Sequence, residues 1–137
     1  MRYLLDTNIL SEPLLPVPNE QVLRRLRDHR DEISTASVVW HEMLFGCYRL
    51  PSSSRRAAIE EYLNEVVSPT VPILPYDARA ARWHAAERAR LTGIGKTPPF
   101  ADGQIAAIAS TNDLVVVTSN VADYAGFREV RVEDWRK

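Results

Sequence analysis

The sequence contains a single cysteine, Cys47, and no long apolar run, and these two absences exclude several classes of protein. One thiol cannot form an intramolecular disulfide, and it cannot supply the thiolates of a Cys-based zinc site. No apolar run approaches the roughly 20 residues of a membrane span. The apolar stretch at the N-terminus is also too short for a signal peptide. We therefore expect a protein of the reducing cytoplasm without a membrane partner.

An excess of charge of one sign is also missing. The chain has 17 Lys and Arg against 18 Asp and Glu, which gives a formal net charge of −1. No overall field attracts a polyanion, so any contact with nucleic acid must come from local clusters of basic residues. One candidate cluster either lines an RNA groove or forms a solvated helix face: Arg79, Arg82, Arg88, Arg90 and Lys96. The length of 137 residues suits one domain with one core, spanning residues 1–137.

What the sequence does contain is a set of four acids set against apolar segments. Asp6 ends the run Tyr3-Leu4-Leu5, and Glu42 lies between Val38-Val39-Trp40 and Met43-Leu44-Phe45. Asp102 opens an Ala- and Ile-rich segment, and Asp123 follows shortly after Val115-Val116-Val117. Acids in apolar surroundings are costly unless a partner compensates them. Since no basic partner is evident nearby, the pattern favours a divalent metal ion and a metal-dependent hydrolase.

Short apolar segments alternate with helical patterns along the chain. The pattern predicts strands near residues 3–6, 32–35, 73–76, 114–118 and 130–132, and helices near 8–14, 20–30, 37–49, 55–67, 78–91 and 101–111. Ser34, Thr35 or Ser37 is expected to cap the third helix, and Asp77 the fifth. Strands separated by helices predict an α/β fold, with a mostly parallel central sheet of about five short strands and helices on both faces.

Function in such sheets gathers beyond the carboxyl ends of the strands. Asp6 and the segment 119–123 directly follow predicted strands, while Glu42 and Asp102 are expected in the first turns of helices. Helix starts can face the same edge of the sheet. We therefore expect the four acids to meet in one cleft.

The motifs and their order resemble those of the PIN-domain ribonucleases, and most closely the VapC-type toxins of bacterial toxin–antitoxin pairs. The likeness rests on Asp6-Thr7-Asn8, on the acid Glu42, on Asp102 at the start of a helix, and on Thr118-x-Asn120-x-x-Asp123-Tyr124. It covers essentially the whole chain. Each motif alone is weak, whereas the ordered set is specific. One departure is Tyr124, where many relatives have Phe.

The resemblance implies a magnesium-dependent endoribonuclease, in which Mn²⁺ can substitute for Mg²⁺. Both ions are hard cations that prefer oxygen ligands, and a bound cation would offset the charge of a phosphodiester and activate a water molecule. Asp6 and Asp102 are the expected direct ligands, and Glu42 and Asp123 would act through water or a second ion. The residues expected to orient these acids by hydrogen bonds are Thr7, Asn8, Thr118 and Asn120.

The resemblance also implies partners. An RNA substrate is expected, together with a homodimer held by apolar helix faces and a cognate antitoxin protein. The antitoxin is expected to place Arg or Lys in the acidic cleft, where a cation can take over the electrostatic role of the metal.

Other interpretations stay open at this stage. Asp6, Asp102 and Asp123 can be caps of turns or helices, and Glu42 can pair with an Arg. A haloacid-dehalogenase-like phosphatase would also have an acid after its first strand, but it needs a second Asp where this chain has Asn8. A PIN-fold binding module without catalytic activity is the third possibility, although all four acids are present. His84, in an Arg-rich helix, is expected to be exposed.

Overall fold

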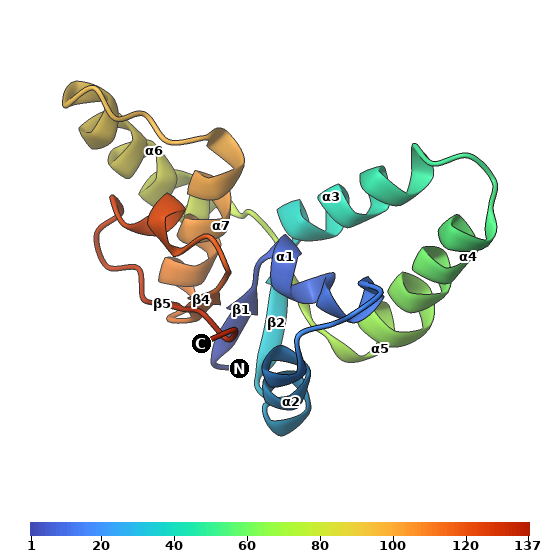
Figure 1. Cartoon of the computed structure of the whole chain (residues 1–137). Helices are drawn as coiled ribbons and strands as arrows, with labels where there is room; N and C mark the ends of the chain where they lie inside the picture. Colours follow the sequence, from blue (N-terminus) through green and yellow to red (C-terminus); the bar gives the residue numbers. More distant parts are fainter.

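Five short strands form one parallel sheet at the centre of the molecule (Figure 1). A computed structural model describes residues 1–137, the whole chain. The strands lie in the order β3-β2-β1-β4-β5, and all four neighbouring pairs are parallel. Their bounds are β1 (Tyr3–Leu5), β2 (Ile33–Ala36), β3 (Ile73–Leu74), β4 (Val115–Val117) and β5 (Val132–Glu133). The predicted α/β class and the mostly parallel sheet are confirmed.

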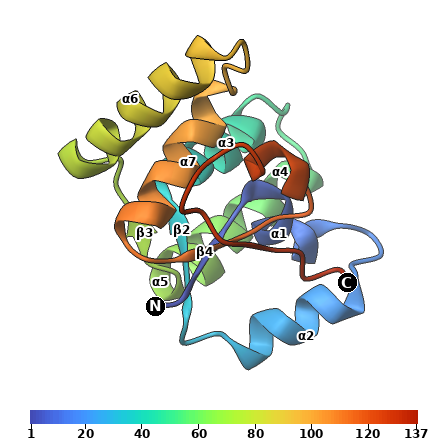
Figure 2. The ribbon, with the colours of Figure 1, turned by 90° about the vertical axis from the view of Figure 1, so that its left-hand side faces the viewer.

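Helices cover both faces of this sheet, as the sequence predicted. On one side lie α1 (Thr7–Leu10), η1 (Glu12–Leu14), α2 (Glu20–Asp28), α3 (Ser37–Tyr48), α4 (Ser54–Glu61), η2 (Tyr62–Val67) and α5 (Ser68–Thr70). On the other side lie α6 (Ala78–Gly93), α7 (Phe100–Thr111) and η3 (Val121–Tyr124). Figure 2 shows α6 packed on the outside of α7. None of these helices is long and apolar enough to cross a bilayer.

The direction in which the chain winds reverses between β1 and β4. The first crossovers run from β1 to β2 and on to β3, and the chain then returns to β4 on the other side of β1. Leu5 at the end of β1 pairs with Val117 at the end of β4. Asp6 and Thr118, the next residues of the two strands, therefore emerge side by side at the crevice where parallel sheets bind ligands.

The core holds α7 firmly against the sheet. All residues from Ile105 to Ala109 are buried, as are the three valines of β4. Small side chains on α7 allow α6 to approach closely from outside. This packing fixes the first turn of α7, and with it Asp102, relative to the carboxyl end of β1.

Two local predictions about helix α3 are wrong. Its N-cap residue is Ala36, without a side-chain hydrogen bond, because Ser34 and Thr35 belong to the buried strand β2. Their hydroxyls donate instead to the carbonyl oxygens of Tyr3 and Leu5, each at 2.8 Å. Because α3 begins at Ser37, Glu42 lies in its second turn rather than its first. The prediction that Asp77 caps α6 is confirmed, since its carboxylate accepts from the Ala80 N–H at 2.9 Å.

The prediction that His84 is exposed is also wrong. His84 is only 2% exposed, and its Nδ1 lies 2.8 Å from the hydroxyl of Tyr76. Its ring fills the space beside Gly103 on α7, where a Cβ would come within 2.6 Å of His84 Cδ2. Gly103 is therefore required for the close contact between α6 and α7.

Candidate active site

Asp6 is the most firmly held of the four acids. It follows β1 and caps α1, since its Oδ1 accepts a hydrogen bond from the Thr7 N–H at 2.8 Å. Its Oδ2 accepts from the hydroxyl of Thr118 at 2.9 Å and from that of Tyr124 at 3.2 Å. The side chain is almost buried, at 8% exposure. Asp6 is thus a cap, and three donors also fix the direction of its carboxylate.

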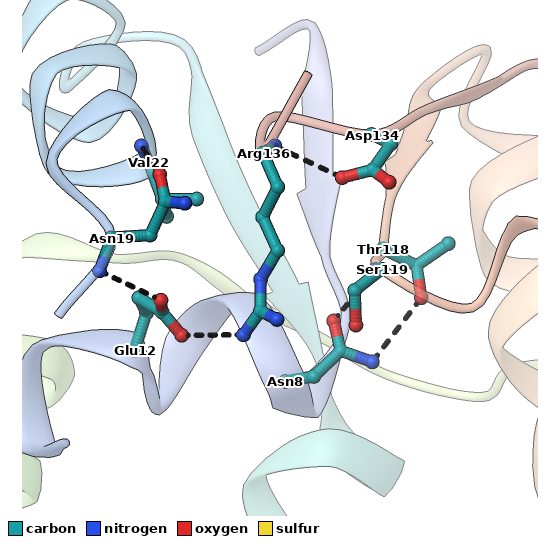
Figure 3. Close-up of polar contacts among 8 residues, drawn as sticks. All are labelled: Asn8, Glu12, Asn19, Val22, Thr118, Ser119, Asp134 and Arg136. Atoms are coloured by element: carbon teal, nitrogen blue, oxygen red, sulfur yellow. Dashed lines mark hydrogen bonds and ion pairs between the residues drawn. The ribbon is translucent and has the colours of Figure 1, made fainter.

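A hydrogen-bond network around Thr118 joins the ends of β1 and β4. Thr118 Oγ1 accepts from the Asn8 side-chain amide at 3.3 Å and from the Asn120 backbone N–H at 3.0 Å. Asn8 Oδ1 accepts from the Ser119 N–H at 2.9 Å (Figure 3). The Thr118 proton is therefore directed at Asp6, because both other interactions of the hydroxyl use its lone pairs. The side chain of Asn120 makes no hydrogen bond to an acid, and only its backbone takes part.

Glu42 reaches the same region from helix α3. Its Oε2 accepts from the hydroxyl of Thr7 at 3.4 Å, a long and weak hydrogen bond. Glu42 forms no ion pair with an arginine, so the interpretation as half of a salt bridge is not supported. The side chain is exposed rather than buried, contrary to what its apolar neighbours in the sequence indicate.

Asp102 lies in the first turn of α7 and has no hydrogen-bonded side-chain partner. The N-cap of this helix is Pro99, so Asp102 does not cap it. Burial raises the pKa of Asp102 to about 6, and the charges of Asp123, Asp6 and Glu42 add to the effect in that order. All three other acids are thus close enough to repel Asp102.

Asp123 lies in η3, the short helix that follows β4, and is exposed. Its backbone N–H donates to Asn120 O at 3.0 Å, but its carboxylate makes no hydrogen bond. The interpretation as a side-chain cap is therefore not supported. The structure brings Asp6, Glu42, Asp102 and Asp123 to one edge of the sheet from four separate elements.

The acids are near one another without forming a closed metal cage. No group of three His, Cys, Asp or Glu side chains is close enough to surround one ion. Yet the pKa of Asp102 responds to all three neighbours. These facts agree if the carboxylates face an open space, since electrostatic repulsion extends further than direct coordination.

Sequence reasoning missed the contribution of Tyr124. It is 1% exposed, and its hydroxyl donates to Asp6. The sequence showed only an aromatic residue after Asp123, and no spacing rule indicates where its hydroxyl points. The basic cluster of α6 and the loop after it is partly engaged: Arg79 donates to Thr111 O, and Arg90 forms an ion pair with Glu87 at 2.8 Å.

Known proteins are similar to this chain over most of its length. The family model described as "PIN domain" matches residues 3–131. The chain is 32% identical over 124 residues to Toxin FitB of Neisseria gonorrhoeae, covering 88% of this chain and 89% of that protein. It is 28% identical over 136 residues to the tRNA(fMet)-specific endonuclease VapC of Shigella flexneri, covering 98% of both.

Solved structures share the fold over nearly the full length. The crystal structure of FitAcB from Neisseria gonorrhoeae has a chain with a TM-score of 0.88 at 31% identity, covering 97% of both chains. A chain of VapBC-5 from Mycobacterium tuberculosis, a member of the VapBC family of toxin–antitoxin systems, has a TM-score of 0.71 at 26% identity. It covers 97% of this chain and 98% of that one.

Proposed function

The chain belongs to the PIN-domain family, and from this membership we propose that it is a metal-dependent endoribonuclease that acts as the toxin of a toxin–antitoxin pair. The observation that carries the proposal is the convergence of four acids on one edge of the sheet. Asp102 has no cationic partner there, and its pKa is raised to about 6 by burial and then by the other three acids. Such an excess of negative charge costs stability unless a cation offsets it.

The donor set fits Mg²⁺ or Mn²⁺, since it consists of carboxylate oxygens without thiolate or imidazole ligands. Asp6 and Asp102 would hold the ion directly, and Glu42 and Asp123 would act through water or a second ion. Bound there, the ion would offset the charge of the scissile phosphodiester and activate a water molecule for attack.

The surrounding residues prepare Asp6 for this role. The Thr118 and Tyr124 hydroxyls both donate to Oδ2, and the Thr7 N–H donates to Oδ1. These bonds leave few orientations open to the carboxylate. Asn8 does not touch Asp6. Its side-chain amide donates to one lone pair of the Thr118 hydroxyl and the Asn120 N–H donates to the other, so the Thr118 proton is directed at Asp6.

The proposed partners follow from the same site. Relatives named as toxin or endonuclease, and a similar chain in a VapBC complex, support an RNA substrate and a cognate antitoxin for this chain. The antitoxin would place an Arg or Lys beside Asp6 and Asp102. A homodimer through apolar helix faces, and action in the cytoplasm where RNA substrates reside, complete the proposal.

An RNA-cleavage assay tests this function. Wild-type protein should cleave RNA with Mg²⁺ or Mn²⁺, and EDTA should stop the reaction reversibly. Asp102→Asn should be inactive, whereas Asp31→Asn should match wild type, because Asp31 is exposed, lies in a turn and makes no side-chain contact with the site. Cleavage that survives EDTA and dialysis would refute the metal mechanism. Folded wild type without any cleavage would favour the catalytically silent binding module instead.

A further inference from the structure

An open cleft of about 620 Å³ lies between helices α3 and α7, directly beside the acids. Glu42 belongs to its lining, so the cleft continues the candidate active site rather than forming a separate cavity. The role proposed above, holding a metal and a phosphodiester, uses only the acidic side. The remaining lining is partly aromatic, which that role does not explain.

Each of the two helices exposes a phenylalanine next to its acid. Phe45 follows Glu42 by one helical turn and is 58% exposed, and Phe100 precedes Asp102 by two residues and is 52% exposed. Both line the cleft. Neighbouring side chains leave about half of each phenylalanine in water, and two such rings on opposite walls of one cleft favour a ligand with an apolar face.

An arginine side chain lies over each of the two phenylalanine rings. The Arg49 guanidinium lies 5.8 Å from the centre of the Phe45 ring, and the Arg88 guanidinium lies 5.3 Å from that of Phe100. The His41 ring stacks on Phe45 at 6.2 Å. Aromatic faces beside guanidinium groups match a single-stranded nucleic acid, which presents flat bases and a negative backbone together.

We propose that this cleft is a base-stacking subsite, in which an unpaired nucleobase next to the scissile phosphate stacks against Phe45 and Phe100. The inference rests on the proposed ribonuclease function and adds a preference for single-stranded RNA at the cleavage point. A paired base cannot enter, because its two faces are covered by its neighbours in the helix. Arg49 and Arg88 contact the phosphates on either side of the bound base.

A second copy of the chain is the alternative occupant of this cleft, and the oligomeric state of Phe45→Leu distinguishes it from RNA.

The test uses the full chain with Asp102→Asn, so that bound RNA stays intact. The probes are short single-stranded RNAs that carry 2-aminopurine at each position in turn, together with the same sequences closed in a hairpin stem. Stacking on an aromatic ring quenches 2-aminopurine fluorescence. The variants Phe45→Leu and Phe100→Leu keep an apolar side chain and remove the ring. Tyr48→Leu is the matched control, because Tyr48 is an exposed aromatic residue of α3 that does not line the cleft.

Quenching is expected at one position of the single-stranded probe and not in the stem. Phe45→Leu should abolish that quenching and raise Kd about tenfold, the scale for losing one stacked base, while Tyr48→Leu changes neither. Phe100→Leu should act in the same direction. Because Phe100 also packs on the His84 ring at 4.8 Å, its folding is checked by thermal melting, and Phe45→Leu alone decides the outcome if Phe100→Leu is unstable.

Unchanged quenching and affinity in Phe45→Leu would overturn the inference. So would a shift from dimer to monomer in this variant with RNA affinity retained, since the cleft would then be an interface between copies. An RNA-cleavage assay with the wild-type protein distinguishes failure of the subsite from failure of the proposed function. If that protein cleaves RNA while Phe45→Leu binds normally, only the subsite fails. If it never cleaves RNA, the proposed function and the subsite fail together.

Discussion

The hydroxyl of Tyr124 donates a hydrogen bond to Oδ2 of Asp6 over 3.2 Å, across a separation of 118 residues in the chain. Burial, and then the negative charge of Asp6 and Asp102, raise the pKa of this phenol, so it stays protonated and remains a donor. The bond joins η3 to the end of β1. It also places a second proton on the carboxylate oxygen that Thr118 already contacts.

Tyr124→Phe should weaken the metal site while the fold persists. Phe fits the same space, and losing one hydrogen bond to a charged group costs about 1.5–3 kcal/mol where the partner stays buried. Without this bond the Asp6 carboxylate is held less firmly in its orientation, so the Mg²⁺ concentration for half-maximal cleavage should rise several-fold. Mn²⁺ binding measured by calorimetry checks this independently of activity. A lower melting temperature with unchanged Mn²⁺ affinity would mean that the bond is purely structural.

Asp102→Asn should abolish cleavage without weakening the metal-free protein. The pKa of Asp102 is raised to about 6, so the charged form is disfavoured in the folded state and its removal relieves repulsion from the other acids. In EDTA at neutral pH, the free energy of unfolding should equal that of wild type or exceed it by up to about 1.4 kcal/mol, the equivalent of one pKa unit.

Added Mg²⁺ distinguishes the two proteins further. A ligand that binds only the native state raises its stability, so Mg²⁺ should raise the melting temperature of wild type more than that of Asp102→Asn. Thermal melting of both proteins in EDTA and then in Mg²⁺ makes the comparison. A mutant that melts well below wild type in EDTA would show that Asp102 supports the fold of α7 instead.

The sequence was sufficient for the order of elements and for the edge at which the acids meet. Strand β4 is three consecutive valines, and Asp6 comes directly after an apolar strand, so local patterns were decisive there. Glu42 and Asp102 could be assigned to helices for the same reason. The place where these elements meet follows from a general rule: in parallel sheets, functional residues gather beyond the carboxyl ends of the strands. Applying that rule needs no knowledge of particular contacts.

Contacts between distant segments were not predictable in the same way. Ser34 and Thr35 looked like helix caps, because the sequence does not reveal that their hydroxyls face the carbonyls of β1. His84 looked solvated among arginines, and only the absence of a side chain at Gly103 makes room for its ring. The ion pair of Glu12 could not be predicted either, because its partner Arg136 lies at the other end of the chain.

The pair of Glu12 and Arg136 fastens the C-terminal segment to the N-terminal half (Figure 3). The two side chains meet at 2.8 Å, and Glu12 is 2% exposed. The other oxygen of Glu12 accepts from the Asn19 N–H at 2.9 Å. The carbonyl of Lys137 also accepts from Gln21 and Arg25 of α2, at 3.0 and 3.2 Å.

Arg136→Gln should therefore destabilise the protein by about 2–3 kcal/mol, because it leaves a buried carboxylate without its cation. Removing one member of a fully buried pair costs about 3–5 kcal/mol, and the partial exposure of Arg136 lowers this. Adding Glu12→Gln should recover part of the loss. Arg131→Gln is the control: its partner Asp113 is exposed, so the effect should stay below about 1 kcal/mol. Urea unfolding of the four proteins measures these differences, and equal losses in Arg136→Gln and Arg131→Gln would contradict the assignment.

Buried His84 should make the fold sensitive to mild acid. Burial, and then the nearby Arg88, lower the pKa of His84 in the folded state, while the unfolded chain keeps a value near about 6.5. As pH falls below about 6.5, the unfolded chain takes up a proton at this site and the folded protein does not. Stability contributed by His84 is therefore fully present at neutral pH, and it declines until the pH reaches the lowered folded value.

His84→Gln should flatten this part of the pH profile, because Gln does not titrate, although it should also lower stability at neutral pH by loosening the packing against Gly103. His29→Gln is the control. His29 lies 2.9 Å from Glu32 and is partly exposed, so it does not share the buried environment of His84. Melting temperatures measured in steps from neutral to mildly acidic pH compare the three proteins, all in EDTA so that metal binding to the acids does not contribute. If His84→Gln keeps the full wild-type slope, the acid sensitivity arises elsewhere, and the carboxylates around Asp102 become the groups to examine.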